Sequence, residues 1–248
     1  MTASDLPGES GLDDRVPFLA RLETADRGAL LGLGRELAYK PRDVLLHQHE
    51  PSSYVLFVTH GWTKVTAAAV NGYEALLALR GPGDIVGESA ALTGRPRSAT
   101  VTALEAVQAV AVDRDRFTEF LGGSPTVSYA LLGLTSDRMR AADQRRLEFA
   151  SMSVRERLAA LLLELAHTNA RYTKAGVELL VPLSKQELAG SVGASREMVQ
   201  RLLKDLRERG VVVTGRRTLK IVRMDVLRRI ARAEGGDRGR TAGVESTF

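Results

Sequence analysis

The chain has 248 residues, of which 44% are hydrophobic, enough for one large or two ordinary domains with their own cores. It contains no cysteine, which excludes disulfides, thiolate zinc sites and cysteine-ligated iron–sulfur clusters. Its formal net charge of +5 favours a polyanionic partner, and no apolar run reaches the length of a membrane span. We therefore expect a cytoplasmic protein that does not interact with membranes.

The first half of the chain passes from a polar leader to a helix and then to strands. Residues 1–17 are rich in Gly, Ser and Asp and lack the pattern of a signal peptide, so we expect a flexible leader. Residues 18–37 carry leucines at helical spacing and predict a helix. Across residues 38–117, short β-rich runs such as Tyr54-Val55-Leu56-Phe57-Val58 alternate with glycines. Short strands separated by turn residues predict an antiparallel sandwich or barrel.

Residues 83–101 form a motif with the composition of an anion site, Gly-Asp-Ile-Val-Gly-Glu-Ser-Ala-Ala-Leu-Thr-Gly-Arg-Pro-Arg-Ser-Ala-Thr-Val. A tight turn at Gly87 precedes a short helix start, whose unpaired N–H groups favour an anion. Arg97 and Ser98 follow nine and ten residues after Glu88. Arginine matches two phosphate oxygens at once, and a neighbouring glutamate can accept hydrogen bonds from sugar hydroxyls. The alternative is a polar loop closed by an ion pair between Glu88 and Arg97.

A long helix is predicted from Ser124-Pro125 to about Met152. A seam with alternating spacings of three and four runs along it, which favours dimerisation through this helix. A surface helix of a monomer is the alternative. The seam comprises Leu132, Thr135, Met139, Ala142, Arg146 and Phe149.

A helix-turn-helix is the strongest motif of the C-terminal half. Ser184 with Glu187 three residues later makes a capping box that begins a first helix. Gly193 supplies the turn, and Ser195 can cap a second helix. An apolar stripe at helical spacing predicts the inward face of that second helix. It comprises Val199, Leu202, Leu203 and Leu206.

The opposite face of the second helix carries side chains that suit DNA bases. Arginine can bond guanine O6 and N7 together, and glutamate can accept from cytosine N4. An ordinary packing corner with a solvated charged face is the alternative. The outward residues are Arg196, Glu197, Gln200, Arg201 and Lys204.

The residues after this helix support DNA binding. Two β-branched runs within residues 211–222 surround a Gly-Arg-Arg tip and predict a hairpin, in which Arg216 can touch phosphate. Residues 180–232 hold 13 Lys and Arg against 5 Asp and Glu, an excess of +8, so the remainder of the +5 chain sums to −3. Basic charge is concentrated at the motif, as expected of a DNA-binding module. The glycine-rich tail, residues 233–248, is predicted to be disordered.

The motif at residues 83–101 closely resembles the phosphate-binding cassette of cyclic-nucleotide-binding domains. Together with Ser195-Arg196-Glu197 and Arg201, it makes the chain similar to the CRP/FNR family of bacterial transcription regulators, over roughly residues 37–231. The resemblance implies an α+β fold with an antiparallel, jelly-roll-like β-roll sensor domain and a C-terminal winged helix-turn-helix. The implied domains are the leader, a sensor at 18–123, a dimerisation helix at 124–150, a DNA-binding domain at 151–232, and the tail.

The resemblance also assigns roles to ligand-binding residues. Family members hold the ribose with the equivalents of Gly87 and Glu88, and the cyclic phosphate with those of Arg97 and Ser98. At the positions where Thr and Ser contact the purine in members that bind cyclic AMP, this chain has Ala142 and Asp143. A second departure is Pro41-Arg42-Asp43, where members often have a glycine turn.

For DNA, the resemblance implies that Arg196, Glu197 and Arg201 read a G–C–G pattern in each half-site. The candidate DNA-binding residues are Lys185, Gln186, Ser195, Arg196, Glu197, Gln200, Arg201, Lys204 and Arg216.

The expected function is that of a ligand-responsive, sequence-specific transcription regulator. It would act as a homodimer on two-fold half-sites of double-stranded DNA, with RNA polymerase as a candidate partner. It would have no cofactor, and a cyclic nucleotide such as cAMP is the candidate effector. The alternative is a constitutive DNA-binding regulator whose sensor binds another ligand or none.

An enzyme is the least favoured class. The sequence has neither a Gly-x-Ser-x-Gly elbow nor a Walker loop. His47 and His49 could share a strand face, but without cysteines or partner carboxylates they make a weak metal site. We therefore expect no catalytic residues and no metal.

Overall fold

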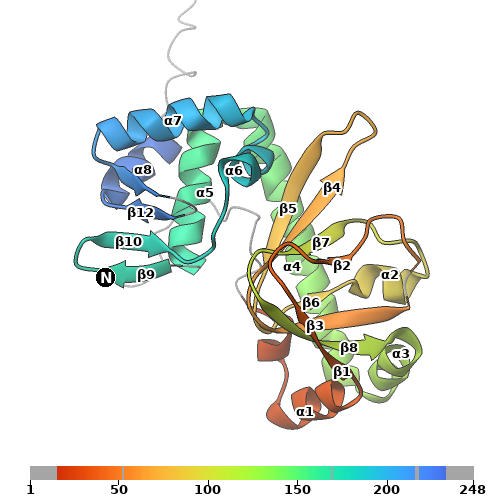
Figure 1. Cartoon of the computed structure of the whole chain (residues 1–248). Coiled ribbons are helices and arrows are strands. Elements are labelled where there is room, and N and C mark those ends of the chain that lie inside the picture. The colour runs from red at the N-terminus through yellow and green to blue at the C-terminus, as the bar shows by residue number, and fades with distance from the viewer. Residues whose placement is uncertain (1–15, 52, 169, 216–217, 233–248) are drawn as a thin grey trace, which may run out of the picture. The chain divides into compact units, whose positions relative to one another are not determined.

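The computed structural model describes residues 16–51, 53–168, 170–215 and 218–232, which fall into two compact units (Figure 1). Within the described residues, the N-terminal unit comprises residues 16–143 with Val181–Leu183, and the C-terminal unit contains residues 144–180 and 184–232. The predicted tail, all but two residues of the predicted leader, and Arg216 lie outside the described residues.

Two four-stranded antiparallel sheets form the centre of the N-terminal unit, which confirms the predicted β-sandwich or barrel. The first sheet has the order β1 (Arg35–Tyr39), β8 (Val107–Asp113), β3 (Tyr54–His60), β6 (Ile85–Val86). The second has the order β2 (Val44–Leu46), β7 (Thr100–Ala103), β4 (Thr63–Ala68), β5 (Glu74–Arg80).

Strand β3 is buried on both faces because the first sheet lies between helices and the second sheet. Val55 and Phe57 belong to a core shared with helices, whereas Leu56 and Val58 belong to a core shared with β2 and β7. Successive side chains of a strand point to opposite faces, so a continuous apolar run serves both cores. The helices of this unit are η1 (Phe18–Arg21), α1 (Thr24–Gly32), α2 (Glu88–Thr93), α3 (Arg114–Gly123) and most of α4 (Pro125–Ser151).

The single helix predicted over residues 18–37 is wrong in its extent. The chain is extended at Leu22, and the second helix ends at Gly32. Residues 35–39 are strand β1, paired with β8. An added Cβ at Gly34 would come within 3.0 Å of Val110 and Val112, so glycine permits the close approach of these strands. Pairing with a strand distant in sequence overrides the local helical spacing.

The C-terminal unit has the predicted helix-turn-helix and wing, with additional elements. Ser184 Oγ accepts from Glu187 N at 3.2 Å and Glu187 Oε2 accepts from Ser184 N at 2.6 Å, which confirms the capping box. The β9–β10 hairpin and helix α8 are not predicted from the sequence patterns. The elements are α5 (Val154–Thr168), β9 (Ala170–Thr173), β10 (Gly176–Leu179), α6 (Lys185–Val192), α7 (Arg196–Glu208), β11 (Val212–Thr214), β12 (Leu219–Ile221) and α8 (Met224–Arg232).

The sheet of this unit has the order β11-β12-β10-β9, so the predicted wing hairpin extends to four strands. Helix α7 turns Val199, Leu203 and Leu206 into the core, while Leu202 is half-buried. Helix α7 packs against α6 and β11, while α5 packs against α8 and α6. None of the helices in the described ranges combines the length and apolar composition that a bilayer span requires.

Candidate nucleotide-binding and DNA-binding sites

The turn between β6 and α2 is built on Gly87. This residue has φ = 85° and precedes the first residue of α2. A Cβ at this position would come within 3.0 Å of Arg97 Nη1, so any other residue would displace the arginine. Glycine is therefore required both by the left-handed backbone and by the close approach of a guanidinium.

Arg97 is buried behind this turn, with 4% of its surface exposed. It donates hydrogen bonds from Nη1 to Gly87 O at 2.8 Å and from Nη2 to Tyr54 O at 2.5 Å. Its guanidinium carbon lies 5.2 Å from the centroid of the Tyr54 ring. Burial lowers the pKa of Arg97, against the opposing influence of Tyr54, Glu88 and Glu50. Arginine remains cationic in proteins, so this is a buried positive charge held by backbone carbonyls.

Glu88 is also buried, and its ion pair is with a residue that the sequence analysis missed. Arg138 on α4 donates from Nη1 to Glu88 Oε1 at 2.6 Å and from Nη2 to Ile85 O at 3.0 Å. The same guanidinium lies 3.6 Å from Asp84 Oδ1. The alternative prediction, an ion pair between Glu88 and Arg97, is therefore wrong for the described structure.

A signal for Arg138 was present in the sequence. Val127, Leu131 and Leu134 are the buried residues of α4, and the same helical spacing continues to position 138. A cation on an otherwise apolar helix face implies a buried anionic partner. That partner lies 50 residues away in the chain, a distance that helical periodicity does not reach.

The remaining predicted ligand residues are exposed. Ser98 follows Arg97 and points to solvent, and Ala142 and Asp143 are exposed on α4. The structure thus brings Gly87, Arg97 and Glu88 to one place. Arg138, one turn before Ala142, joins α4 to Glu88.

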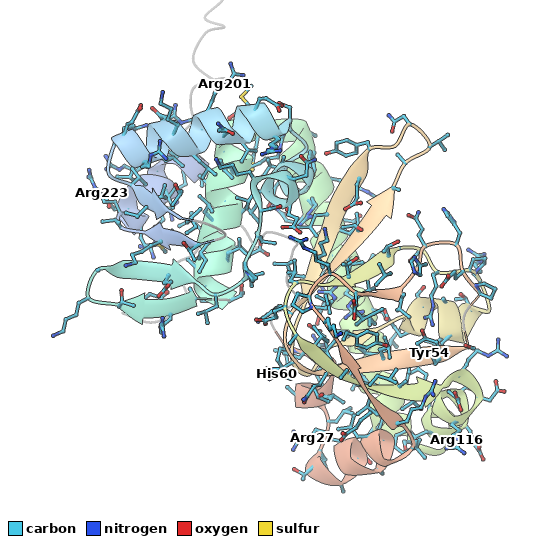
Figure 2. All side chains as sticks on the ribbon, in the orientation of Figure 1. Arg27, Tyr54, His60, Arg116, Arg201 and Arg223 are labelled. Atoms are coloured by element: carbon cyan, nitrogen blue, oxygen red, sulfur yellow. The ribbon has the colours of Figure 1, made fainter. Side chains whose placement is uncertain are left out.

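The second helix of the helix-turn-helix presents its predicted outer face. All five predicted outward residues of α7 are exposed, and Figure 2 shows Arg201 on the outer side of the helix. Ser195 Oγ accepts from Met198 N at 3.2 Å and so caps α7. Hydrogen bonds from its own backbone N–H and from Ser195 lower the pKa of Glu197. That side chain is therefore a charged acceptor, the form needed to bond cytosine N4.

Lys185 and Gln186 are exposed at the start of α6. Among the described residues, no three His, Cys, Asp or Glu side chains cluster as metal ligands would.

Comparison with known proteins decides the family. The family model "Cyclic nucleotide-binding domain" matches residues 36–123, and "Crp-like helix-turn-helix domain" matches residues 156–230. The CRP-like cAMP-activated global transcriptional regulator of Mycobacterium tuberculosis is 31% identical over 161 residues, 65% of this chain and 72% of the relative. The cyclic AMP receptor protein of Thermus thermophilus is 30% identical over 187 residues, 75% and 83% of the two chains.

The chain belongs to the CRP/FNR family. Members of this family are transcription regulators rather than enzymes. The c-di-GMP responsive global regulator CLP of Xanthomonas campestris has the same fold, with a TM-score of 0.73 at 22% identity over 81% of this chain and 100% of that one. The sequence-based expectation of a CRP/FNR fold is confirmed.

Proposed function

We propose that this chain is a homodimeric transcription regulator that reads DNA with α7 and responds to a cyclic nucleotide bound at Gly87, Glu88, Arg97 and Ser98. The observation that carries the ligand proposal is the buried guanidinium of Arg97 packed against a glycine that tolerates no side chain. A guanidinium has five N–H donors, so its two bonds to carbonyls are compatible with further bonds to a phosphate. The two relatives described above are named for cyclic AMP.

Binding of a ribose at Glu88 would compete with Arg138. Glu88 accepts from Arg138 at 2.6 Å, and sugar hydroxyls would have to share or replace that bond. Arg138 belongs to α4, so ligand binding would alter a contact between the nucleotide site and this helix. Such a differential contact is what allows a ligand to shift a conformational equilibrium.

The base-selecting part of the site favours a different specificity from that of cyclic AMP binders. Ala142 has no side-chain group for a base, and Asp143 can only accept hydrogen bonds when ionised. The existing Glu88–Arg138 pair and Ala142 together favour the second candidate function, a constitutive regulator whose sensor binds another ligand or none. We retain the domain division at 18–123, 124–150 and 151–232 as part of the proposal.

The DNA proposal is supported by the exposed, capped N-terminal half of α7 and by the excess of basic residues in this unit. Arg201 would bond a guanine, Glu197 a cytosine, and the lysines of α6 and α7 the phosphates. Two copies of α7 in a dimer would read half-sites about one DNA turn apart. RNA polymerase is a candidate partner at such sites.

Selection of bound sites from a random DNA library, with no nucleotide, cyclic AMP or cyclic GMP, tests both parts. We expect a two-fold symmetric site, and a ligand-dependent affinity change of roughly five- to 150-fold. Arg201→Ala should relax preference at one position per half-site, whereas Arg207→Ala, an exposed arginine of the same helix, should not. Failure to enrich any site would refute the DNA-reading role, and enrichment without a ligand effect would support the constitutive alternative.

Calorimetry tests the ligand site separately. We expect Arg97→Ala to abolish cyclic-nucleotide binding, because the phosphate would lose its buried cationic partner. Arg95→Ala is the matched control, since this arginine is exposed two residues earlier. Equal loss in both variants, or binding unaffected by Arg97→Ala, would contradict the assignment.

A further inference from the structure

The end of α4 contacts the turn of the helix-turn-helix through one aromatic ring. Phe149 lies two residues before the end of α4, in the part of this helix that belongs to the C-terminal unit. A Cβ at Gly193 would come within 3.0 Å of the Phe149 Cε1 atom and 3.3 Å from Cδ1 and Cζ. The ring therefore occupies the space that a side chain at the turn would need. Phe149 is also a member of the dimer seam predicted from the sequence.

One arginine holds this contact together. The guanidinium carbon of Arg157 lies 4.7 Å from the centroid of the Phe149 ring. Arg157 Nε donates to Val192 O at 2.9 Å, and its Nη1 donates to Met152 O at 2.5 Å. The first carbonyl belongs to the last residue of α6, and the second follows the end of α4. A single side chain thus links two helix ends and the ring.

The turn that these residues hold sets where α7 begins. Gly193 has φ = 61° and donates its backbone N–H to Ala189 O. Ser195, two residues later, caps α7. A displacement of the α4 end would therefore move the turn and the first residues of α7, which the proposed function assigns to base recognition.

We propose that Phe149 and Arg157 form a latch that positions the start of α7 relative to the end of α4. They are positioning residues for DNA recognition, acting through Gly193 rather than touching DNA. This inference rests on the proposed function. Arg138 lies near the middle of α4, and the latch lies at the C-terminal end of the same helix. Through this contact, a change in α4 would displace the base-reading face of α7.

Hydrogen exchange on the full-length protein tests the latch without relying on DNA binding. Phe149→Ala should increase amide exchange in the peptide that spans residues 189–198. Leu147→Ala is the matched control, because Leu147 is a more exposed apolar residue of the same helix turn, and it should leave that peptide unchanged. Phe149→Tyr keeps the ring and should preserve protection. Equal protection in wild type and Phe149→Ala would overturn the proposal.

Alanine variants of two glycines with positive φ distinguish the effect of the steric contact with Phe149 from the effect of backbone strain. Gly193 and Gly210 have φ values of 61° and 65°, but nothing lies within 4 Å of a Cβ built at Gly210. Both alanine variants carry the same backbone strain, and only Gly193→Ala must displace Phe149. We expect Gly193→Ala to lower specific operator affinity about ten-fold more than Gly210→Ala, the equivalent of one base contact.

The ratio of specific to non-specific DNA affinity identifies a positioning role. A misplaced α7 should lower this ratio, because base contacts are lost while phosphate contacts remain. Partial unfolding would lower both affinities together. The double variant Phe149→Ala/Gly193→Ala should bind the specific operator no more weakly than the single variant with the lower affinity. Losses of operator affinity that add up in the double variant would contradict the latch. If wild type itself shows a ratio of one, the proposed function fails, while the exchange experiment still decides whether the latch exists.

Discussion

The residue with the clearest backbone strain is Arg42, which has φ = 79° in the turn between β1 and β2. Its amide N–H donates to Ala103 O at 2.8 Å, and Asp43 N donates to Lys40 O at 3.0 Å, so hydrogen bonds fix the turn. The left-handed region costs a non-glycine residue about 1–2 kcal/mol. Arg42 belongs to Pro41-Arg42-Asp43, where the resemblance noted from the sequence implies that family members often have a glycine turn.

Arg42→Gly should therefore stabilise the protein. The relief of strain exceeds the entropic cost of glycine, about 0.5–1 kcal/mol, so we expect a net gain of up to about 1 kcal/mol in the free energy of unfolding. Lys40→Gly is the control, because Lys40 is exposed in the same turn without a positive φ, and it should destabilise instead. Urea denaturation measures both. A loss of stability in Arg42→Gly as large as in Lys40→Gly would disprove the strain argument.

Arg138 is a largely buried cation, and its removal should be strongly destabilising. Its side chain is 16% exposed, and it neutralises Glu88 and approaches Asp84. Arg138→Gln leaves a buried carboxylate without its cation, which should lower the free energy of unfolding by about 3–5 kcal/mol.

The loss in the free energy of unfolding caused by Arg138→Gln should become smaller when Glu88→Gln is added, because the uncompensated charge is then removed. Arg140→Gln, a 71% exposed arginine paired with Asp137, should cost less than about 1 kcal/mol. Denaturation of wild type, Arg138→Gln, Glu88→Gln and the double variant completes the cycle. If Glu88→Gln does not rescue Arg138→Gln, the two side chains do not act as a buried ion pair.

At the scale of elements, the sequence predicted those whose signals are local. The capping box at Ser184 and the apolar stripe of α7 lie within a few residues of the structure they specify, and both appear as predicted. The prediction of one helix over residues 18–37 failed because strand β1 pairs with β8, whose partner residues are 68 to 76 positions away in the chain, and Gly34 packs against the same strand. The nucleotide site shows the same division, since Gly87 and Arg97 belong to one contiguous motif whereas the partner of Glu88 belongs to α4.

The C-terminal end of α4 carries a carboxylate whose titration is coupled to folding. Burial raises the pKa of Glu148, while Gln144, Arg145 and Arg157 oppose that change. An acid with a raised pKa in the folded state binds protons more tightly there than in the unfolded chain. Its contribution is therefore fully favourable below the ordinary value near 4.5, and is lost as the pH rises through the folded-state value.

Glu148→Gln should consequently increase stability at pH 7 and lose this advantage below pH 4.5. Glutamine can still accept from Gln144, which donates to Glu148 Oε1 at 3.4 Å, so the packing is retained. Glu208→Gln, at an exposed site on α7, is the control for removing one carboxylate outside this buried contact. Thermal denaturation from pH 4 to 8 gives the comparison. A stability difference between wild type and Glu148→Gln that stays constant with pH would rule out the burial of this charge as its cause.

At the scale of the whole molecule, the distribution of charge along the chain separates a basic C-terminal part from an acidic remainder, which no single motif shows. The basic excess lies in residues 180–232, and the rest of the chain has a net charge of −3.

Pairing of two chains is different, because it depends on a surface rather than on a motif. Leu132 and Met139 are seven residues apart on α4 and remain 61% and 63% exposed, as an unpaired apolar seam would be. Their exposure fits the predicted dimer helix, which stays a prediction.

Leu132→Asp tests that seam. In a dimer paired through this seam, two copies of this residue would meet near the two-fold axis between the helices, and two like charges placed there in an apolar contact would oppose association. We expect the variant to sediment as a monomer at concentrations where wild type is a dimer. It should also lose affinity for a two-fold operator while binding a single half-site as wild type does, because each α7 is unchanged. Leu92→Asp, at a 44% exposed leucine on α2, is the matched control and should remain dimeric. A Leu132→Asp protein that still dimerises would place the interface elsewhere on the chain.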